Sequence, residues 1–150
     1  MMKKIPCICL LLVAVFVAQA QTLEDITAIT LTKQSRGFVD EVIISRDSVR
    51  AFSENHRSAD SAFHYATDVD TDRWAKLILA LKDVPLQELD GLQSPTTKRA
   101  HDGAIHSSIV ITFEDGTSVS HSFDDETPHP DLQPLLDAIN EFRIASPKHR

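Results

Sequence analysis

A two-residue alternation of side chains between residues 105 and 123 constrains the fold of this 150-residue chain more than any other feature. Mostly apolar side chains occupy every second position on both sides of Glu114-Asp115-Gly116, a pattern typical of half-buried β-strands. A three-residue loop pairs Ile111 with Val119 and gathers the apolar residues on one face, whereas a two-residue loop would place serines there. The longer loop needs a left-handed residue, which glycine adopts at little cost. We therefore predict an antiparallel hairpin with Gly116 at positive φ.

Two other stretches carry apolar residues at helical spacing, three and four positions apart. The first stripe consists of Trp74, Leu77, Ile78, Leu81 and Val84, and the second of Leu132, Leu135, Leu136, Ile139 and Phe142. Asp70 and Asp131 stand just before the two stripes, where N-cap residues are found. The sequence therefore predicts two amphipathic helices, the first of them anchored in the core by Trp74.

Weaker alternation predicts three short strands at the start of the domain, over residues 27–32, 38–45 and 49–53. Residues 54–66 are polar and irregular and predict a loop. The predicted order is βββ-α-ββ-α. The simplest packing is an α+β fold, an antiparallel sheet of about five strands with the two amphipathic helices on one face.

The first twenty residues have the features of a secretory signal peptide. Lys3 and Lys4 precede an uncharged run over residues 5–18, and Ala18-Gln19-Ala20 supplies a small-residue cleavage site. The run is shorter than the roughly 18 residues that span a bilayer. We predict a signal peptide at residues 1–20 and a single α+β domain at residues 21–150. The mature protein is expected to be exported to the periplasm or the medium, without membrane insertion after cleavage.

Composition excludes several functional classes for the exported domain. Cys7 and Cys9 both lie within residues 1–20, so disulfide scaffolds and thiol chemistry are not expected in the rest. The chain has a formal net charge of −7, and loss of Lys3 and Lys4 makes the remainder more acidic still. An acidic surface repels phosphate backbones, so nucleic acid is not an expected partner.

The chain carries no recognisable catalytic motif. His101, Asp102 and His106 form its tightest cluster of possible metal ligands, but their spacing matches no known ligand pattern. The sequence has neither a nucleophile elbow nor a phosphate-binding loop, and the acidic run at residues 124–126 is expected to be a solvated loop. We predict no metal, no cofactor and no catalytic activity. A small hydrolase or a metal-dependent enzyme using His101, Asp102 and His106 is the least favoured alternative.

Short segments of the chain resemble known proteins. Gln34-Ser35-Arg36-Gly37-Phe38 follows a first strand, a helix carries the tryptophan, Asp102-Gly103-Ala104 opens a hairpin, and Pro-Asp-Leu begins the last helix. This frame resembles small bacterial exported proteins of unknown function. It is also similar to the emfourin-type inhibitors of thermolysin-like metallopeptidases, small sheet-plus-helix proteins with a Gly-Gly-Phe stretch after the first strand. Arg36 stands where that family usually has glycine.

Polar loops on a rigid scaffold commonly form binding surfaces. We therefore predict a non-enzymatic binding domain whose partner is an unidentified protein or envelope ligand. The candidate binding loops are formed by Ser35, Arg36, Gly37, Phe38, Lys98, Arg99, His101 and Asp102. The resemblance implies the alternative function, in which the protein inhibits a thermolysin-like metallopeptidase by placing one of these loops on the protease surface.

Overall fold

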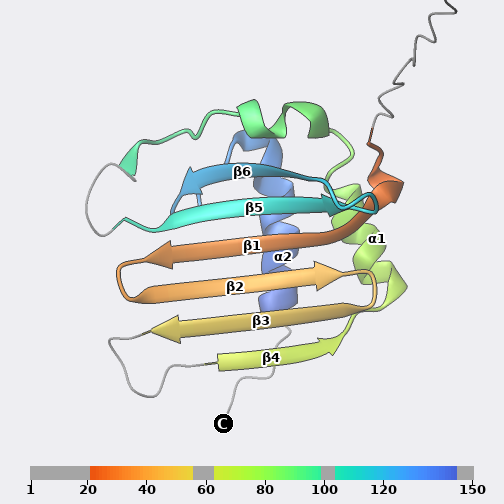
Figure 1. Ribbon diagram of the computed structural model, residues 1–150, viewed down its shortest axis with the longest axis horizontal. Coiled ribbons are helices and arrows are strands. Elements are labelled where there is room, and N and C mark those ends of the chain that lie inside the picture. Colours follow the sequence, from red (N-terminus) through yellow and green to blue (C-terminus); the bar gives the residue numbers. More distant parts are fainter. Residues whose placement is uncertain (1–20, 56–62, 99–103, 145–150) are drawn as a thin grey trace, which may run out of the picture.

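The computed structural model describes residues 21–55, 63–98 and 104–144. These residues form one antiparallel sheet in the order β4-β3-β2-β1-β5-β6 (Figure 1). The first four strands are a meander, and the last two form a hairpin beside β1. The strands are β1 (Ile26–Ser35), β2 (Phe38–Ser45), β3 (Ser48–Asn55), β4 (Phe63–Asp68), β5 (His106–Phe113) and β6 (Ser118–Asp124).

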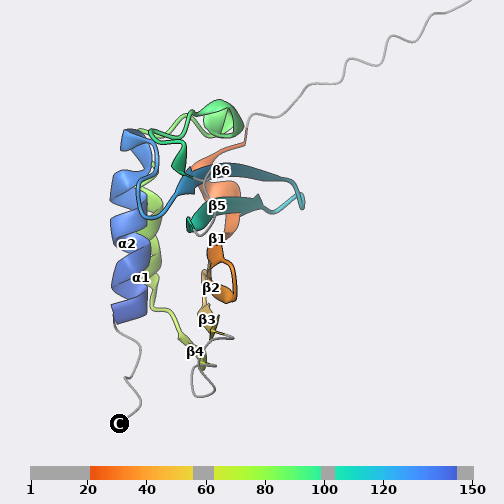
Figure 2. The ribbon, with the colours of Figure 1, turned by 90° about the vertical axis from the view of Figure 1, so that its left-hand side faces the viewer.

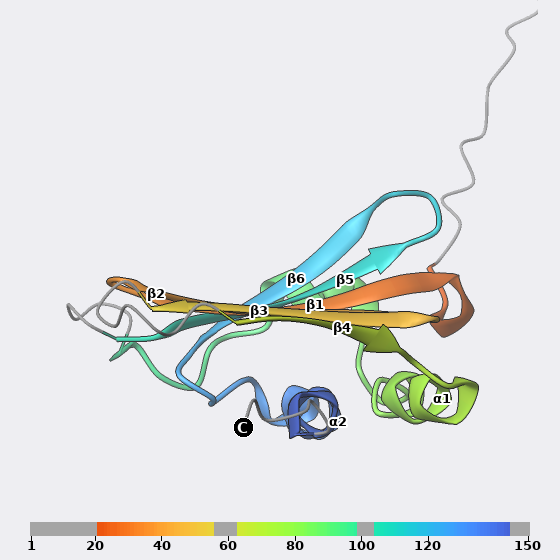
Figure 3. The ribbon, with the colours of Figure 1, turned by 90° about the horizontal axis from the view of Figure 1, so that it is seen from below.

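Helices α1 (Thr71–Leu79) and α2 (Gln133–Ile144) pack on the same face of the sheet, as Figures 2 and 3 show. Short 3-10 helices occur at Leu23–Asp25, Leu86–Gly91 and Pro130–Leu132, labelled η1, η2 and η4. The predicted α+β class is confirmed. The predicted strand count is wrong, because the sheet has six strands.

The strand missing from the prediction is β4, which lies in the stretch expected to be irregular. His64, Ala66 and Asp68 are exposed, and Tyr65 between them is only half-buried. A strand at the edge of a sheet buries little, so its alternation of apolar and polar residues is weak. Pairing with β3, in which Ala51 lies opposite Tyr65, holds this segment in the sheet.

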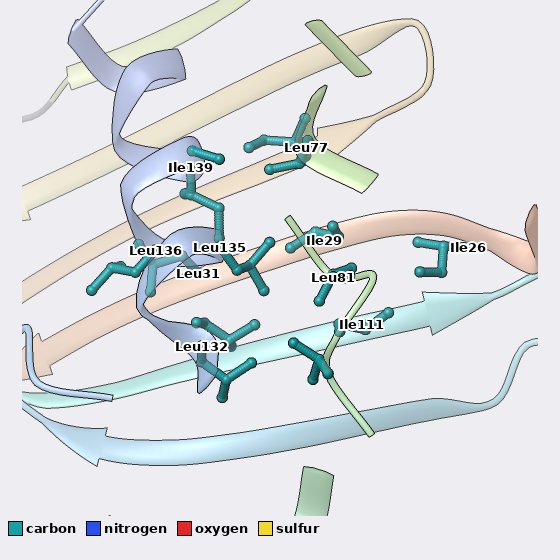
Figure 4. Close-up of a cluster of buried hydrophobic side chains, with 14 of the residues drawn as sticks. Ile26, Ile29, Leu31, Leu77, Leu81, Ile111, Leu132, Leu135, Leu136 and Ile139 are labelled. Carbon is teal, nitrogen blue, oxygen red and sulfur yellow. The ribbon is translucent and has the colours of Figure 1, made fainter. Parts of the chain in front are cut away.

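The apolar core lies between the sheet and the two helices. Figure 4 shows side chains from the central strands, from α1 and the turn after it, and from α2 gathered in one cluster. Leu77 and Leu81 are fully buried there, whereas Trp74 is only half-buried and packs against the rim. Leu77 is therefore the fully buried anchor of α1, and Trp74, the anchor that we predicted, packs against the core from a half-buried position.

The hairpin of β5 and β6 has the predicted register. Ile111 pairs with Val119, and the N–H of Phe113 donates to the carbonyl oxygen of Thr117 at 3.0 Å. Gly116 has a φ of 81°, as the three-residue loop requires. The alternation of apolar and polar side chains was therefore sufficient to predict this register.

The two helix starts were predicted with unequal success. The carboxylate of Asp70 accepts the N–H of Arg73 at 2.8 Å, so Asp70 is the N-cap of α1 as predicted. Asp131 is not the cap of α2, because a 3-10 turn precedes that helix. The Nδ1 atom of His129 accepts the N–H of Asp131 at 3.4 Å and caps this turn.

Candidate binding surface on the open face of the sheet

The face of the sheet opposite α1 and α2 is the candidate binding surface, which we call the open face. Within the described part of the chain both helices lie on the other side, as Figure 3 shows. The register places Thr30, Ile43 and Arg50 in one row across β1, β2 and β3 of the open face. Thr32 and Glu41 stand in the next row, where the Thr32 hydroxyl donates to the Glu41 carboxylate at 3.3 Å.

A hollow of about 450 Å³ lies on the open face over β2, β3 and β4. Its lining residues are Glu41, Ile43, Arg50, Ala51, Phe52, His64, Tyr65 and Ala66. The rings of Phe52 and His64 lie 4.9 Å apart between centroids, at an angle of 52°, and form an aromatic surface. We call this site the β2–β4 hollow.

The β2–β4 hollow combines an aromatic surface with a free guanidinium. Arg50 is exposed, and within the described residues it forms no ion pair. A guanidinium presents five donors in a planar fork that matches a carboxylate or a phosphate. The hollow therefore suits a ligand that carries an acidic group beside an apolar or aromatic group.

A second hollow of about 300 Å³ lies over β1, β5 and β6. Most of its lining residues are of polar type, namely Thr32, Gln34, His106, Ser107, Ser108 and Ser122, and Phe123 completes the lining. The Ser107 hydroxyl donates to the backbone carbonyl of Asp125. His106 is exposed at the rim, at the end of β5 nearest the predicted binding loops.

The first predicted loop is the tight turn between β1 and β2. Ser35 pairs with Phe38, so Arg36 and Gly37 form the tip. Gly37 has a φ of 79°, a conformation that side chains with a Cβ rarely adopt. Arg36 is exposed at this tip, while Phe38 is partly buried.

Lys98, from the second predicted loop, lies at the same end of the sheet. Its backbone N–H donates to the buried carboxylate of Asp124 at 2.7 Å, and its Nζ atom lies 3.1 Å from Asp125. Asp124 pairs with His106, which in turn pairs with Gln34 of β1. The structure thus brings Lys98 to the end of the sheet at which the β1–β2 turn lies; Figure 1 shows that turn between the two strands. Arg99, His101 and Asp102 lie outside the described residues.

The acidic run at residues 124–126 is only in part the solvated loop that we expected, because Glu126 is exposed but Asp124 is not. Asp124 is completely buried and also accepts a hydrogen bond from the Thr96 hydroxyl. Glu126 forms an ion pair with Lys33, which is buried on the helix-covered face of β1. The Lys33 ammonium, by its hydrogen bond and then by its charge, holds the pKa of Glu126 below its ordinary value. Sequence adjacency could not show this, because the partners are far apart in the chain.

His121 is the most buried histidine of the described residues, at 2% exposure. Its Nε2 atom accepts the backbone N–H of His129 at 3.2 Å, and its ring stacks on Phe123 with centroids 5.7 Å apart. A nitrogen that already accepts a backbone N–H is not available as a general base. Across residues 21–55, 63–98 and 104–144, no group of three or more histidine, cysteine or acidic side chains could hold a metal ion.

No protein-family model matches the chain, and no curated protein is similar to it. None of the helices in the described segments is long and apolar enough to cross a membrane. What the structure defines is a small α+β domain with one covered and one open face.

Proposed function

We propose that the protein is an exported binding domain without catalytic activity, which holds a protein or envelope ligand on the open face of its sheet. The observation that carries this proposal is the β2–β4 hollow, in which Arg50 stands beside Phe52 and His64 and forms no ion pair with any residue that the structure describes. Such a combination offers a ligand both a charge-assisted hydrogen bond and an apolar contact.

The rigidity of the site supports this function. The side chains come from neighbouring strands joined by continuous backbone pairing, so the backbone that carries them is already in place before the ligand arrives. Preorganised groups lose little conformational entropy on binding. A partner that places a carboxylate on Arg50 and an apolar group against Phe52 would fit without rearrangement of the sheet.

The test is affinity capture from envelope extract and culture medium of the source organism, with the exported protein immobilised as bait. Arg50→Glu reverses the charge in the hollow. Lys82→Glu is the matched control, because it makes the same charge change on an exposed residue after α1. We expect quantitative mass spectrometry to find proteins that the wild-type protein and Lys82→Glu retain and Arg50→Glu loses. Identical capture by all three baits, with both variants folded, would refute binding through this hollow.

The alternative function, inhibition of a thermolysin-like metallopeptidase, is favoured by a different observation. Arg36 is exposed at the tip of a tight turn, and Lys98 lies at the same end of the sheet. A rigid protruding turn of this kind can occupy a protease surface with little entropic cost. The resemblance to the emfourin-type inhibitors points to the same turn.

This alternative is tested with purified exported protein and a thermolysin-like peptidase. Inhibition at micromolar concentration or below is expected, with weaker inhibition by Arg36→Ala and Phe38→Ala. Arg50→Glu lies on the open face and should inhibit as well as the wild-type protein. Lack of inhibition across a panel of such peptidases would exclude this function. Metal-dependent turnover that His101→Ala abolishes would overturn both proposals.

A further inference from the structure

The two edges of the sheet differ in whether other parts of the described chain cover their outward-facing N–H and C=O groups. At the β6 edge, the N–H of Ser120 donates to the carboxylate of Asp90, which belongs to η2. A side chain and a helix therefore cover that edge, which is a common protection against pairing with another strand. Figure 2 shows β4 as the outermost strand at the other edge, beyond the ends of both helices. The described residues place no further strand beside it.

The register identifies which groups of β4 point outward. The N–H of Val69 donates to the carbonyl of Asp47 at 2.9 Å, and this pair continues the register of Ser48 with Asp68. Backbone direction alternates along an antiparallel strand. Odd-numbered residues of β4 therefore direct their N–H and C=O groups toward β3. His64, Ala66 and Asp68 direct theirs away from the sheet.

We infer that β4 pairs antiparallel with β4 of a second copy of this chain, about a two-fold axis at Ala66. This register lets His64, Ala66 and Asp68 of each copy form about six backbone hydrogen bonds in total. It also places His64 of one copy opposite Asp68 of the other, twice. Both side chains are exposed, and among the described residues neither forms an ion pair.

Charge complementarity selects this register over its neighbours. A shift that centres the pair on His64 or on Asp68 places like side chains opposite each other. The smaller shifts also lose the contact between His64 and Asp68, because a pair centred on residue 65 places His64 opposite Ala66 and one centred on residue 67 places Asp68 opposite Ala66. Opposite charges directly across a strand pair stabilise it, and like charges destabilise it. The His64 ring also donates a hydrogen bond to a carboxylate when it is neutral, so the contact does not need a charged imidazole.

The axis of this pairing is perpendicular to the sheet, so both copies keep their helices on the same side. Two six-stranded sheets then become one continuous sheet with one continuous open face. His64 and Ala66 line the β2–β4 hollow, so the two hollows adjoin the axis. An isologous contact of this kind closes after two copies and builds no fibre.

The test is analytical ultracentrifugation of the exported protein from about 1 to 300 µM, the range expected for a small reversible interface. Ala66→Pro removes an outward N–H that β3 does not use, and proline is tolerated on an edge strand in this orientation. We expect it to weaken dimerisation at least tenfold without lowering the thermal unfolding midpoint, whereas the control Ala66→Ser, which keeps the N–H, should dimerise normally.

Charge reversal gives an independent readout if Ala66→Pro fails to fold. Asp68→Lys replaces the carboxylate opposite each His64 with an ammonium group, which cannot accept a hydrogen bond from the imidazole, and should weaken the dimer at least tenfold. Adding His64→Glu restores opposite charges and should recover most of the affinity. A wild-type protein that stays monomeric throughout, or a dimer that neither Ala66→Pro nor Asp68→Lys weakens, would overturn the inference. A protein that binds extended peptides at β4 but not itself would be monomeric in this experiment and would overturn it equally.

Discussion

Replacing Glu126 should destabilise the protein more than replacing its ion-pair partner Lys33, because the two ends of the pair are buried very differently. The Lys33 side chain is 6% exposed and the Glu126 side chain is 64% exposed. Glu126→Ala leaves a buried ammonium without this acceptor. Lys33→Met removes the buried charge and fills the same space, while the freed Glu126 carboxylate turns to water. Charge is costly to bury and cheap to expose.

The expected magnitudes follow from these exposures. A hydrogen bond to a charged group contributes about 1.5–3 kcal/mol, and solvent around Glu126 lowers that to about 1 kcal/mol. Leaving the Lys33 ammonium without this acceptor adds about 1 kcal/mol. This penalty is small because Asp40 lies directly opposite Lys33 in the β1–β2 pair, so an acidic residue remains close to the ammonium. Glu126→Ala should therefore cost about 2 kcal/mol, which lowers a urea midpoint by about 1 M. Lys33→Met should change stability by less than about 1 kcal/mol in either direction.

The pH dependence gives a second measure of the same pair. Lys33 lowers the pKa of Glu126 in the folded protein. As the pH falls, Glu126 is therefore protonated at a higher pH in the unfolded chain than in the folded protein. The stabilisation is therefore fully present above the ordinary glutamate pKa of 4.5 and is lost as the pH falls through the lower folded value. Urea unfolding at pH 7 and pH 3 should show the gap between wild type and Glu126→Ala closing in acid. A gap that does not change with pH, or a larger cost for Lys33→Met, would refute this account.

Three further predictions concern the core, the hairpin and the processing of the chain. Leu77→Ala should cost about 2–5 kcal/mol, because Leu77 is fully buried, and Trp74→Ala should cost less in the same urea titration. Gly116→Ala should lower stability by about 1 kcal/mol, because Gly116 has a φ of 81° that a residue with a Cβ adopts only at a cost. Gly91→Ala is the control, since both sites have open space for a Cβ but Gly91 has no positive φ. It should leave the thermal midpoint unchanged. Mass spectrometry of protein recovered from the native host should show a chain that starts at Gln21, and an intact N-terminus would contradict the signal peptide.

The sequence predicted those parts of the fold in which one face is strongly apolar. The hairpin register followed from alternation around Gly116, and Asp70 is the N-cap of α1 as expected. Burial of one face leaves a clear periodic pattern, since a shift of one residue would expose it. β4 was missed because an edge strand has no such requirement.

The candidate site was less predictable, because its residues are joined by register and not by proximity in the chain. Arg50, Phe52 and His64 come from two strands, and the open face on which they meet shows a mixed pattern of Thr, Ile and Arg. The turn at Arg36 was predicted, since glycine at a strand end is a local signal. The open-face site could have been suspected only once β4 was known to pair with β3.

The end of the sheet that carries the turn is held differently from the rest of the fold. Lys33 and Asp40 lie opposite each other just below the turn, on the helix-covered face of the sheet. Glu126 contacts the first of them, and Arg143 of α2 contacts the second.

Ion pairs therefore replace apolar packing beneath the turn, and they connect it to the loop after β6 and to the end of α2. Paired buried charges add little net stability, but they fix geometry. It follows that Glu126→Ala should increase hydrogen exchange at residues 34–39 more than in the centre of the sheet. If the turn is the inhibitory element, the same substitution should weaken inhibition without touching any residue of the turn. Unchanged exchange at residues 34–39 would show that backbone pairing alone holds the turn.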